Sequence, residues 1–183
     1  MHNRKILIIG EVYVDQHLDI IENGYSTSRL GGIFHAARSC DALNIEYALA
    51  YYAPDYLVKD VEKFGIDVLR ASSIFRLGKV DKAPNVMLIG QSDESGNQLY
   101  ENILGRQAEY VSMLPFMQVL DDLDPTDIII FPGRYGNAGI LSNLSNYEGK
   151  IHIDMNYDCD DILDLDTIKI QTVFLSSSST SFE

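Results

Sequence analysis

Two adjacent glycines stand directly before a predicted helix in the stretch RLGGIFHAARSCDALN, residues 29–44. Glycine allows a positive φ and a close approach of the backbone to a ligand, and the N–H groups of the first helical turn point at the same place. Gly31 and Gly32 therefore predict a site for a polar ligand. The alternative is a turn that needs glycine for packing alone. His35 lies in the first turn of the helix, and the alternative for this side chain is a hydrogen-bonding surface residue.

A carboxylate follows the first predicted strand. The run KILIIG, residues 5–10, is apolar at nearly every position, and Asp15 comes shortly after it in EVYVD. Open α/β sheets bind ligands outside the carboxyl ends of their parallel strands, and a carboxylate there can accept two hydroxyl protons. Asp15 is thus a candidate for binding a ligand that carries hydroxyl groups. The alternative is an aspartate that only accepts hydrogen bonds from loop amides.

Strands and helices alternate along the chain. Apolar runs typical of strands buried on both faces occupy residues 5–10, 46–52, 127–133, 150–156 and 172–176. Helices are predicted between them over residues 32–44, 54–65 and 113–123. In the first helix we expect Phe34, Ala37 and Ala42 to face the sheet, and we expect Gly65 to end the second. This alternation predicts a single α/β domain over residues 1–183, with a mainly parallel sheet flanked by helices.

One segment departs from the alternation. Residues 73–106 have the pattern of strands joined by a turn at DESGN, residues 93–97, without a helical stretch long enough for a crossover. We therefore expect an antiparallel β-flap that projects from one edge of the parallel sheet.

The charge balance excludes two classes of partner. Fourteen Lys and Arg against 27 Asp and Glu give a formal net charge of -13, which repels nucleic-acid backbones and anionic membrane surfaces. No apolar run approaches the roughly 18 residues that span a bilayer, and no signal-peptide pattern is present at the N-terminus. We expect a cytoplasmic protein that binds neither nucleic acid nor membrane. Cys40 and Cys159 belong to no Cys-x-x-Cys or Cys/His cluster, which argues against structural zinc and a disulfide framework.

Two further segments only partly match known ligand loops. Residues 154–165 have calcium-type ligands at the first, third and fifth positions, but Cys159 stands where glycine is needed and Leu165 where a bidentate glutamate is needed. We expect a solvated acidic loop and no metal site. The glycine-rich stretch GRYGNAG, residues 133–139, lacks the spacing of phosphate and dinucleotide loops and is expected to be a plain loop.

The order of these features resembles the N-terminal, substrate-binding portion of the ribokinase-like (PfkB) family of sugar and nucleoside kinases. The family's Gly-x-x-x-x-Asp segment is matched by Gly10 to Asp15, and its Gly-Gly, helix, Leu-Gly pattern is similar to Gly31-Gly32 through Leu43-Asn44. Its β-flap resembles residues 73–106, and two later strands are similar to IHIDMNYD and TVFLSSSSTSFE. The likeness covers essentially all 183 residues.

The resemblance implies a role for each candidate residue. Asp15 would bind substrate hydroxyls beside Gly31 and Gly32, and the flap would close over the sugar. His35 stands where the family has a substrate-contacting asparagine, with one residue deleted before it. The resemblance also implies a small-molecule sugar or nucleoside as substrate, and ATP and Mg²⁺ as cofactors. A second copy paired through the flap, or an additional C-terminal domain, are the partners it implies.

Two family motifs are missing. Ser178 and Ser181 stand where the family has Asn-x-x-Glu, and Gly-Ala-Gly-Asp, which supplies the anion hole and the catalytic base, occurs nowhere in the 183 residues. Phosphoryl transfer needs stabilisation of the transferred group and a base. We expect this chain alone to be inactive, its catalytic residues being unknown. Two interpretations stay open: the substrate-binding half of a kinase whose nucleotide-binding half would follow residue 183, or a non-catalytic, kinase-derived ligand-binding or interaction domain of a larger protein.

Overall fold

The computed structural model describes residues 5–17, 27–92, 98–103, 108–131, 137–155 and 168–175. Within them lies a large sheet of seven strands in the order β11-β10-β9-β1-β4-β5-β8. In chain order these strands are β1 (Ile6–Glu11), β4 (Tyr47–Ala53), β5 (Ile74–Asp81), β8 (Glu109–Ser112), β9 (Asp127–Ile130), β10 (Lys150–Met155) and β11 (Ile170–Leu175). Neighbouring strands run parallel except β8, which is antiparallel to β5.

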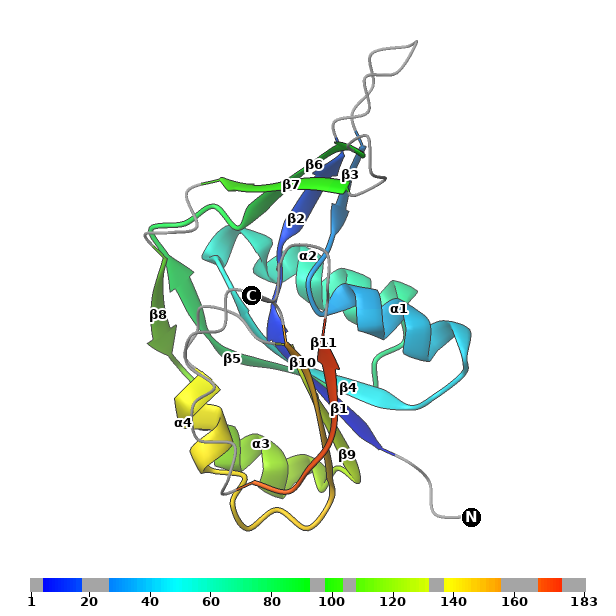
Figure 1. Cartoon of the computed structure of the whole chain (residues 1–183), viewed down its shortest axis with the longest axis vertical. Coiled ribbons are helices and arrows are strands. Elements are labelled where there is room, and N and C mark those ends of the chain that lie inside the picture. Colours follow the sequence, from blue (N-terminus) through cyan, green and yellow to red (C-terminus); the bar gives the residue numbers. More distant parts are fainter. Residues whose placement is uncertain are drawn as a thin grey trace, which may run out of the picture.

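Helices cover both faces of this sheet (Figure 1). One face packs against α1 (Phe34–Ala42) and α2 (Val58–Lys63), and the other against α3 (Phe116–Leu123) and the segment that begins with α4 (Asn137–Ser142). Every residue of β1 and β4 is buried, as expected for apolar runs that lie between two helical layers. The predicted α/β fold with a mainly parallel sheet flanked by helices is therefore confirmed.

Two details of the helices differ from the expectation. Gly65 does not end the second helix, because α2 continues into a π-helical segment, Phe64–Val68, with Gly65 buried inside it. A Cβ on Gly65 would lie 2.4 Å from Ile74 Cδ1, so this glycine serves close packing against β5. In α1 the buried residues are Phe34, Ala37 and Cys40, which recur every third position, whereas Ala42 at the helix end is exposed.

A second, smaller sheet lies beyond one end of the large one (Figure 1). It has the order β3-β2-β6-β7, with β2 (Val14–His17), β3 (Thr27–Leu30), β6 (Val86–Ser92) and β7 (Gln98–Ile103). The pairs β2–β3 and β6–β7 are antiparallel, and β2 and β6 are parallel to each other.

The boundaries of this flap differ from the expected 73–106. Residues 74–81 form β5 of the large sheet, parallel to β4, whereas β2 and β3 join β6 and β7 in the flap. The apolar pattern of a strand does not reveal which sheet it joins, because that depends on hydrogen bonds to residues distant in sequence.

Some expectations fall on residues that the structure does not describe: the turn at 93–97, most of the acidic segment 154–165, Cys159, and the serines that follow β11. Residues 137–139 of the expected loop 133–139 are the first residues of α4, and residues 133–136 lie outside the description. Among the described residues, none of the helices has the length and apolar character that crossing a bilayer requires.

Candidate functional site

Asp15 is a buried carboxylate on β2 of the flap, contacted from β3 and from α1. Its residue is only 3% exposed, and it lies in β2 directly opposite Arg29 of β3. Directly opposed residues of an antiparallel pair project from the same face, which brings Arg29 Nε within 3.7 Å of Asp15 Oδ2. His35 Nε2 approaches the same oxygen from α1, at 3.0 Å. Two side chains from different elements therefore converge on one carboxylate oxygen.

The Oδ2 atom of Asp15 keeps unused capacity to accept hydrogen bonds. It is inaccessible to solvent, and among the described residues it has no partner with hydrogen-bond geometry, although His35 lies within ion-pair distance. Arg29 and His35, each with a half-exposed side chain, cover it. A buried carboxylate oxygen without a hydrogen bond is costly, and a donor supplied by a ligand would offset that cost.

Gly31 is required by the position of Asp15. A Cβ on Gly31 would lie 2.1 Å from Asp15 Oδ1 and 2.3 Å from Cγ and Oδ2, so any other residue would collide with the carboxylate. The Gly31 N–H donates to Tyr13 O at 2.8 Å, which ties the Gly-Gly turn to the chain segment between β1 and β2.

Gly32 is required for a different reason. Its φ is +62°, and a Cβ there would lie 2.1 Å from Glu11 O. The turn into α1 thus uses one glycine for a left-handed backbone and the other for closeness to a side chain. The next residue, Ile33, donates its N–H to Glu11 O at 3.1 Å, so the turn also contacts the end of β1.

A second buried polar cluster surrounds Glu11 at the carboxyl end of β1. Tyr110 donates its hydroxyl hydrogen to Glu11 Oε1 at 2.7 Å, and Asn85 Nδ2 donates to Glu11 Oε2 at 3.3 Å and to Val12 O at 3.1 Å. Asn85 has a positive φ of 47° and is only 2% exposed. Because Gly32 and Ile33 contact Glu11 while Gly31 contacts Asp15, the two clusters border the same turn.

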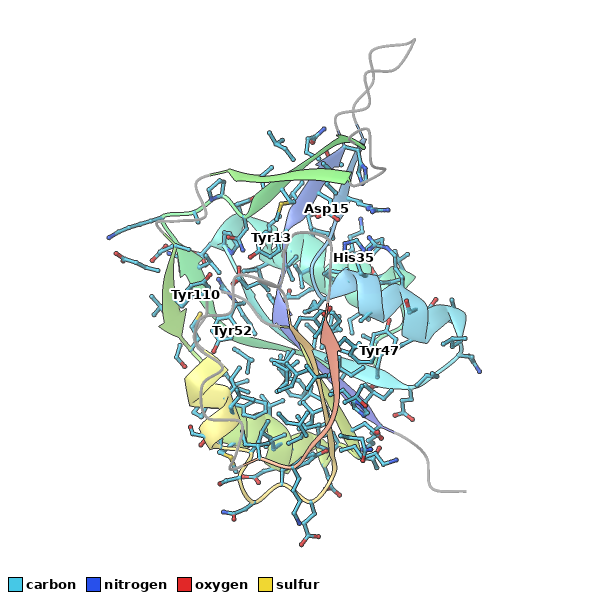
Figure 2. The ribbon with its side chains drawn as sticks, in the orientation of Figure 1. Tyr13, Asp15, His35, Tyr47, Tyr52 and Tyr110 are labelled. Carbon is cyan, nitrogen blue, oxygen red and sulfur yellow. The ribbon has the colours of Figure 1, made fainter. Side chains whose placement is uncertain are left out.

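Figure 2 shows the arrangement of these side chains. Asp15 lies on β2 of the flap with Tyr13 just below it, His35 lies on α1, and Tyr110 and Tyr52 lie at the large sheet. The rings of Tyr52 and Tyr110 meet edge to face, with centroids 6.2 Å apart. Carboxylates, amides and tyrosine hydroxyls bind hydroxyl groups, and aromatic rings pack on apolar faces, so the chemistry of this region suits a polar, neutral or charged small molecule.

Arg38 adds a second guanidinium to the surroundings of Asp15. It follows His35 by three positions on α1 and so lies on the same side of the helix. Its Nη2 donates to Leu30 O at 2.6 Å, and the guanidinium lies 5.5 Å from the centroid of the Phe64 ring. Burial is the main cause that lowers the pKa of Arg38, and repulsion from Arg29 lowers it further, while Asp15 raises it.

The residues expected from the sequence thus meet in one place. The structure brings together Asp15, Gly31, Gly32 and His35. It adds residues that the sequence reasoning missed: Glu11, Arg29, Arg38, Asn85 and Tyr110. Glu11 could have been noticed as an acidic residue at a strand end, but Asn85 and Tyr110 are 74 and 99 positions away from it and carry no local signal.

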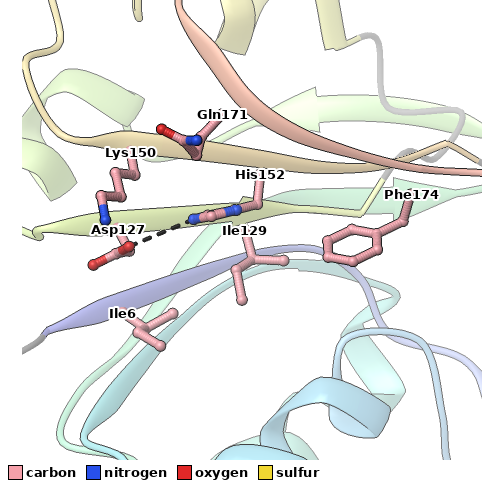
Figure 3. A pocket seen from close by; sticks show the side chains of 7 residues that line it. All are labelled: Ile6, Asp127, Ile129, Lys150, His152, Gln171 and Phe174. Atoms are coloured by element: carbon pink, nitrogen blue, oxygen red, sulfur yellow. Dashed lines mark hydrogen bonds and ion pairs between the residues drawn. The ribbon is translucent and has the colours of Figure 1, made fainter.

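A separate cavity lies elsewhere on the large sheet (Figure 3). It has a volume of about 240 Å³ and is lined by strand residues, namely Ile6, Asp127, Ile129, Lys150, His152, Gln171 and Phe174. Its polar feature is a contact of 3.4 Å between His152 Nε2 and Asp127 Oδ1. Most of these residues lie toward the beginnings of their strands, whereas parallel sheets bind ligands at the opposite, carboxyl ends. We therefore take the surroundings of Asp15 as the candidate functional site.

Solved structures share this fold. A ribokinase from Giardia lamblia superimposes with a TM-score of 0.61 at 16% identity, covering 90% of this chain and 54% of that chain. A fructokinase from Xylella fastidiosa superimposes with a TM-score of 0.59 at 11% identity, covering 84% of this chain and 53% of that chain. A microbiome-derived acarbose kinase superimposes with a TM-score of 0.58 at 14% identity, covering 99% of this chain and 63% of that chain. The chain therefore spans a little more than half the length of these structures.

Sequence comparisons add no relative: no protein-family model matches the chain, and no curated protein matches it. Because identities of 11–16% are low, the structural likeness establishes the fold alone. The chain has a ribokinase-like fold.

Proposed function

We propose that this chain is the substrate-binding part of a sugar or nucleoside kinase, with Asp15 binding substrate hydroxyls and the flap covering them. Support comes from the ribokinase-like fold and the place of Asp15, which lies in β2 of the small sheet, shortly beyond the carboxyl end of β1. The same place in an open α/β sheet is where ligands bind. We further propose that it acts in the cytoplasm.

The single observation that carries the proposal is the Oδ2 atom of Asp15, which is buried and has no hydrogen bond among the described residues. A fully buried carboxylate oxygen without a hydrogen bond among the described residues accepts a hydrogen bond from a ligand hydroxyl. His35 covers this oxygen with a half-exposed side chain, so the ligand enters by displacing the imidazole. His35 then lies beside the ligand, where its ring nitrogens can donate to or accept from a hydroxyl. Gly31 and Gly32 let the turn approach the Asp15 carboxylate and the end of β1 closely, which keeps the carboxylate in this place.

Residues that would hold ATP and Mg²⁺ are not identified in the part of the chain that the structure describes. Among the described residues no group of three His, Cys, Asp or Glu side chains could hold a metal ion. The sequence also contains no Gly-Ala-Gly-Asp. We therefore assign binding to the residues around Asp15 and derive no step of phosphoryl transfer from them. ATP and Mg²⁺ belong to the proposed complete kinase.

Calorimetric titration tests the proposal. The chain is titrated with a panel of polyols, sugars and nucleosides, and the tightest binder is then titrated into Asp15→Ala. A charge-assisted hydrogen bond contributes about 1.5–3 kcal/mol, so the variant should bind roughly ten to 150 times more weakly. Asp122→Asn, an exposed change on α3, is the control and should bind like the original chain. Equal affinity of Asp15→Ala and the original chain would contradict the role of Asp15.

A non-catalytic ligand-binding domain is the second candidate function. Within the chain, Ser178 and Ser181 in place of the family's Asn-x-x-Glu favour it. Both candidates predict the same binding at Asp15, and they differ only in whether a complete protein containing this chain releases ADP from ATP when the ligand is present.

A further inference from the structure

The side chains around Asp15 form a cationic rim in a strongly acidic protein. Arg29, His35 and Arg38 come from the two elements that flank the Gly-Gly turn, β3 and α1. Asp15 is the carboxylate that they surround, since Arg29 and His35 lie within ion-pair distance of it and it is the acidic group that acts on Arg38. The formal net charge of the whole chain is -13, so a local excess of positive charge is unexpected from composition.

In the part of the chain that the structure describes, no carboxylate forms an ion pair with Arg38. Among the described residues its hydrogen-bond partner is the carbonyl of Leu30, and its Nη1 is buried without a hydrogen bond. Arg29 shares Asp15 Oδ2 with His35. Among the described residues, two guanidiniums and one imidazole therefore share a single nearby carboxylate. Repulsion from Arg29 is one cause that lowers the pKa of Arg38.

Binding of a hydroxyl would change this balance. A hydroxyl that donates to Asp15 Oδ2 takes the position that His35 and Arg29 now face, so their interaction with the carboxylate weakens. A neutral ligand would leave these cations with less compensation than before, whereas a ligand that carries a carboxylate or a phosphate would restore it. Arginine binds both groups through two parallel N–H donors.

We infer that the site prefers anionic over neutral polyhydroxylated ligands, with Asp15 accepting a hydroxyl and Arg29 and Arg38 binding a carboxylate or phosphate of the same molecule. The inference rests on the proposed function, because it assumes that hydroxyls bind at Asp15. It narrows the substrate class to sugar acids, sugar phosphates or nucleotides, and the neutral forms of the same compounds become the weaker ligands.

Matched pairs of compounds test the preference. The chain is titrated with D-glucose and D-glucuronate, D-ribose and D-ribose 5-phosphate, and adenosine and AMP, with inorganic phosphate as a separate probe. At an ionic strength of about 0.01 M, at least one anionic member should bind about tenfold or more tightly than its neutral partner. The preference should shrink at about 0.15 M, since salt screens exposed charges.

Two variants locate the preference. Arg29→Gln and Arg38→Gln should each reduce the ratio of anionic to neutral affinity severalfold. Arg29 is half exposed, so its variant remains informative even where Arg38→Gln, which loses the bond to Leu30, unfolds. Arg70→Gln is the matched control, because Arg70 is exposed and pairs with Asp41 near the other end of α1. It should leave the ratio unchanged.

The outcomes separate this inference from the proposed function. Equal binding of the neutral and anionic members, or a ratio unchanged in both site variants, overturns the anionic preference and leaves hydroxyl binding at Asp15 standing. Inorganic phosphate that binds as tightly as ribose 5-phosphate, with no effect of Asp15→Ala, refutes the proposed function, because the hydroxyls then contribute nothing. Binding by none of the probes counts against both.

Discussion

Replacement of Gly31 by alanine should disable the site through one steric contact. The added Cβ would lie 2.1 Å from Asp15 Oδ1, whereas ordinary contacts begin near 3.4 Å, so the carboxylate must move by more than about 1 Å. The backbone of Asp15 is fixed by the pairing of β2 with β3, and the Asp15 side chain is buried. Gly31 has no positive φ, so alanine adds no backbone strain and the collision is the main effect.

The expected losses of stability and of ligand affinity in Gly31→Ala follow from this overlap. Overpacking a buried position costs about 1–3 kcal/mol, which corresponds to a fall in Tm of roughly 2–12 °C for a chain of this size. Displacement of the carboxylate should also weaken ligand binding about tenfold or more. Thermal unfolding and calorimetric titration measure the two effects.

A double-mutant cycle shows whether Asp15 is the cause. In Asp15→Ala the colliding oxygens are absent, so adding Gly31→Ala should then cost little stability. Gly149→Ala is the matched control: its Cβ would lie 2.3 Å from the Tyr147 hydroxyl, so it should destabilise the fold without weakening binding. An equal loss of stability from Gly31→Ala with and without Asp15 would refute the reasoning.

Three further predictions concern other parts of the molecule. Burial raises the pKa of Asp154, so the folded chain binds this proton more tightly than the unfolded chain, and the ionised Asp154 lowers the stability of the fold. Asp154→Asn should therefore raise Tm at pH 7, and this gain should shrink as the pH falls through the raised pKa toward 3.8. A gain in Tm that does not depend on pH would contradict this cause. Tyr110→Phe should lower the free energy of unfolding by about 1–3 kcal/mol in urea titrations, because Glu11 loses a donor, and no change would show that the bond contributes nothing. The 183-residue chain alone, with its intact mass verified, should release ADP only at background rate in a coupled assay, and release above that of a His35→Ala, Asp15→Ala double variant would place a catalytic base within it.

Local sequence patterns determined the layered core. The runs that became β1 and β4 are apolar at consecutive positions because both of their faces are covered, and this burial is visible in the sequence without any partner being known. The position of α1 and the two glycines before it also follow from local rules, since a left-handed φ at Gly32 and a helix that buries every third residue each leave a mark on neighbouring residues.

The division into two sheets was decided only by the tertiary structure. The pattern of residues 74–81 is that of a strand, but whether it pairs with β4 or with β6 depends on hydrogen bonds between distant segments. The same holds for the site. Asp15 could be chosen from the sequence because it follows a strand, yet its pairing with Arg29 is set by the register of β2 and β3, and its contact with His35 by the packing of α1 beside the flap. The contacts of Glu11 with Asn85 and Tyr110 form because β8, antiparallel to β5, begins near the carboxyl end of β1, and because β6 of the small sheet begins beside the segment that follows β1. No periodicity within a single segment can express such pairings between distant segments.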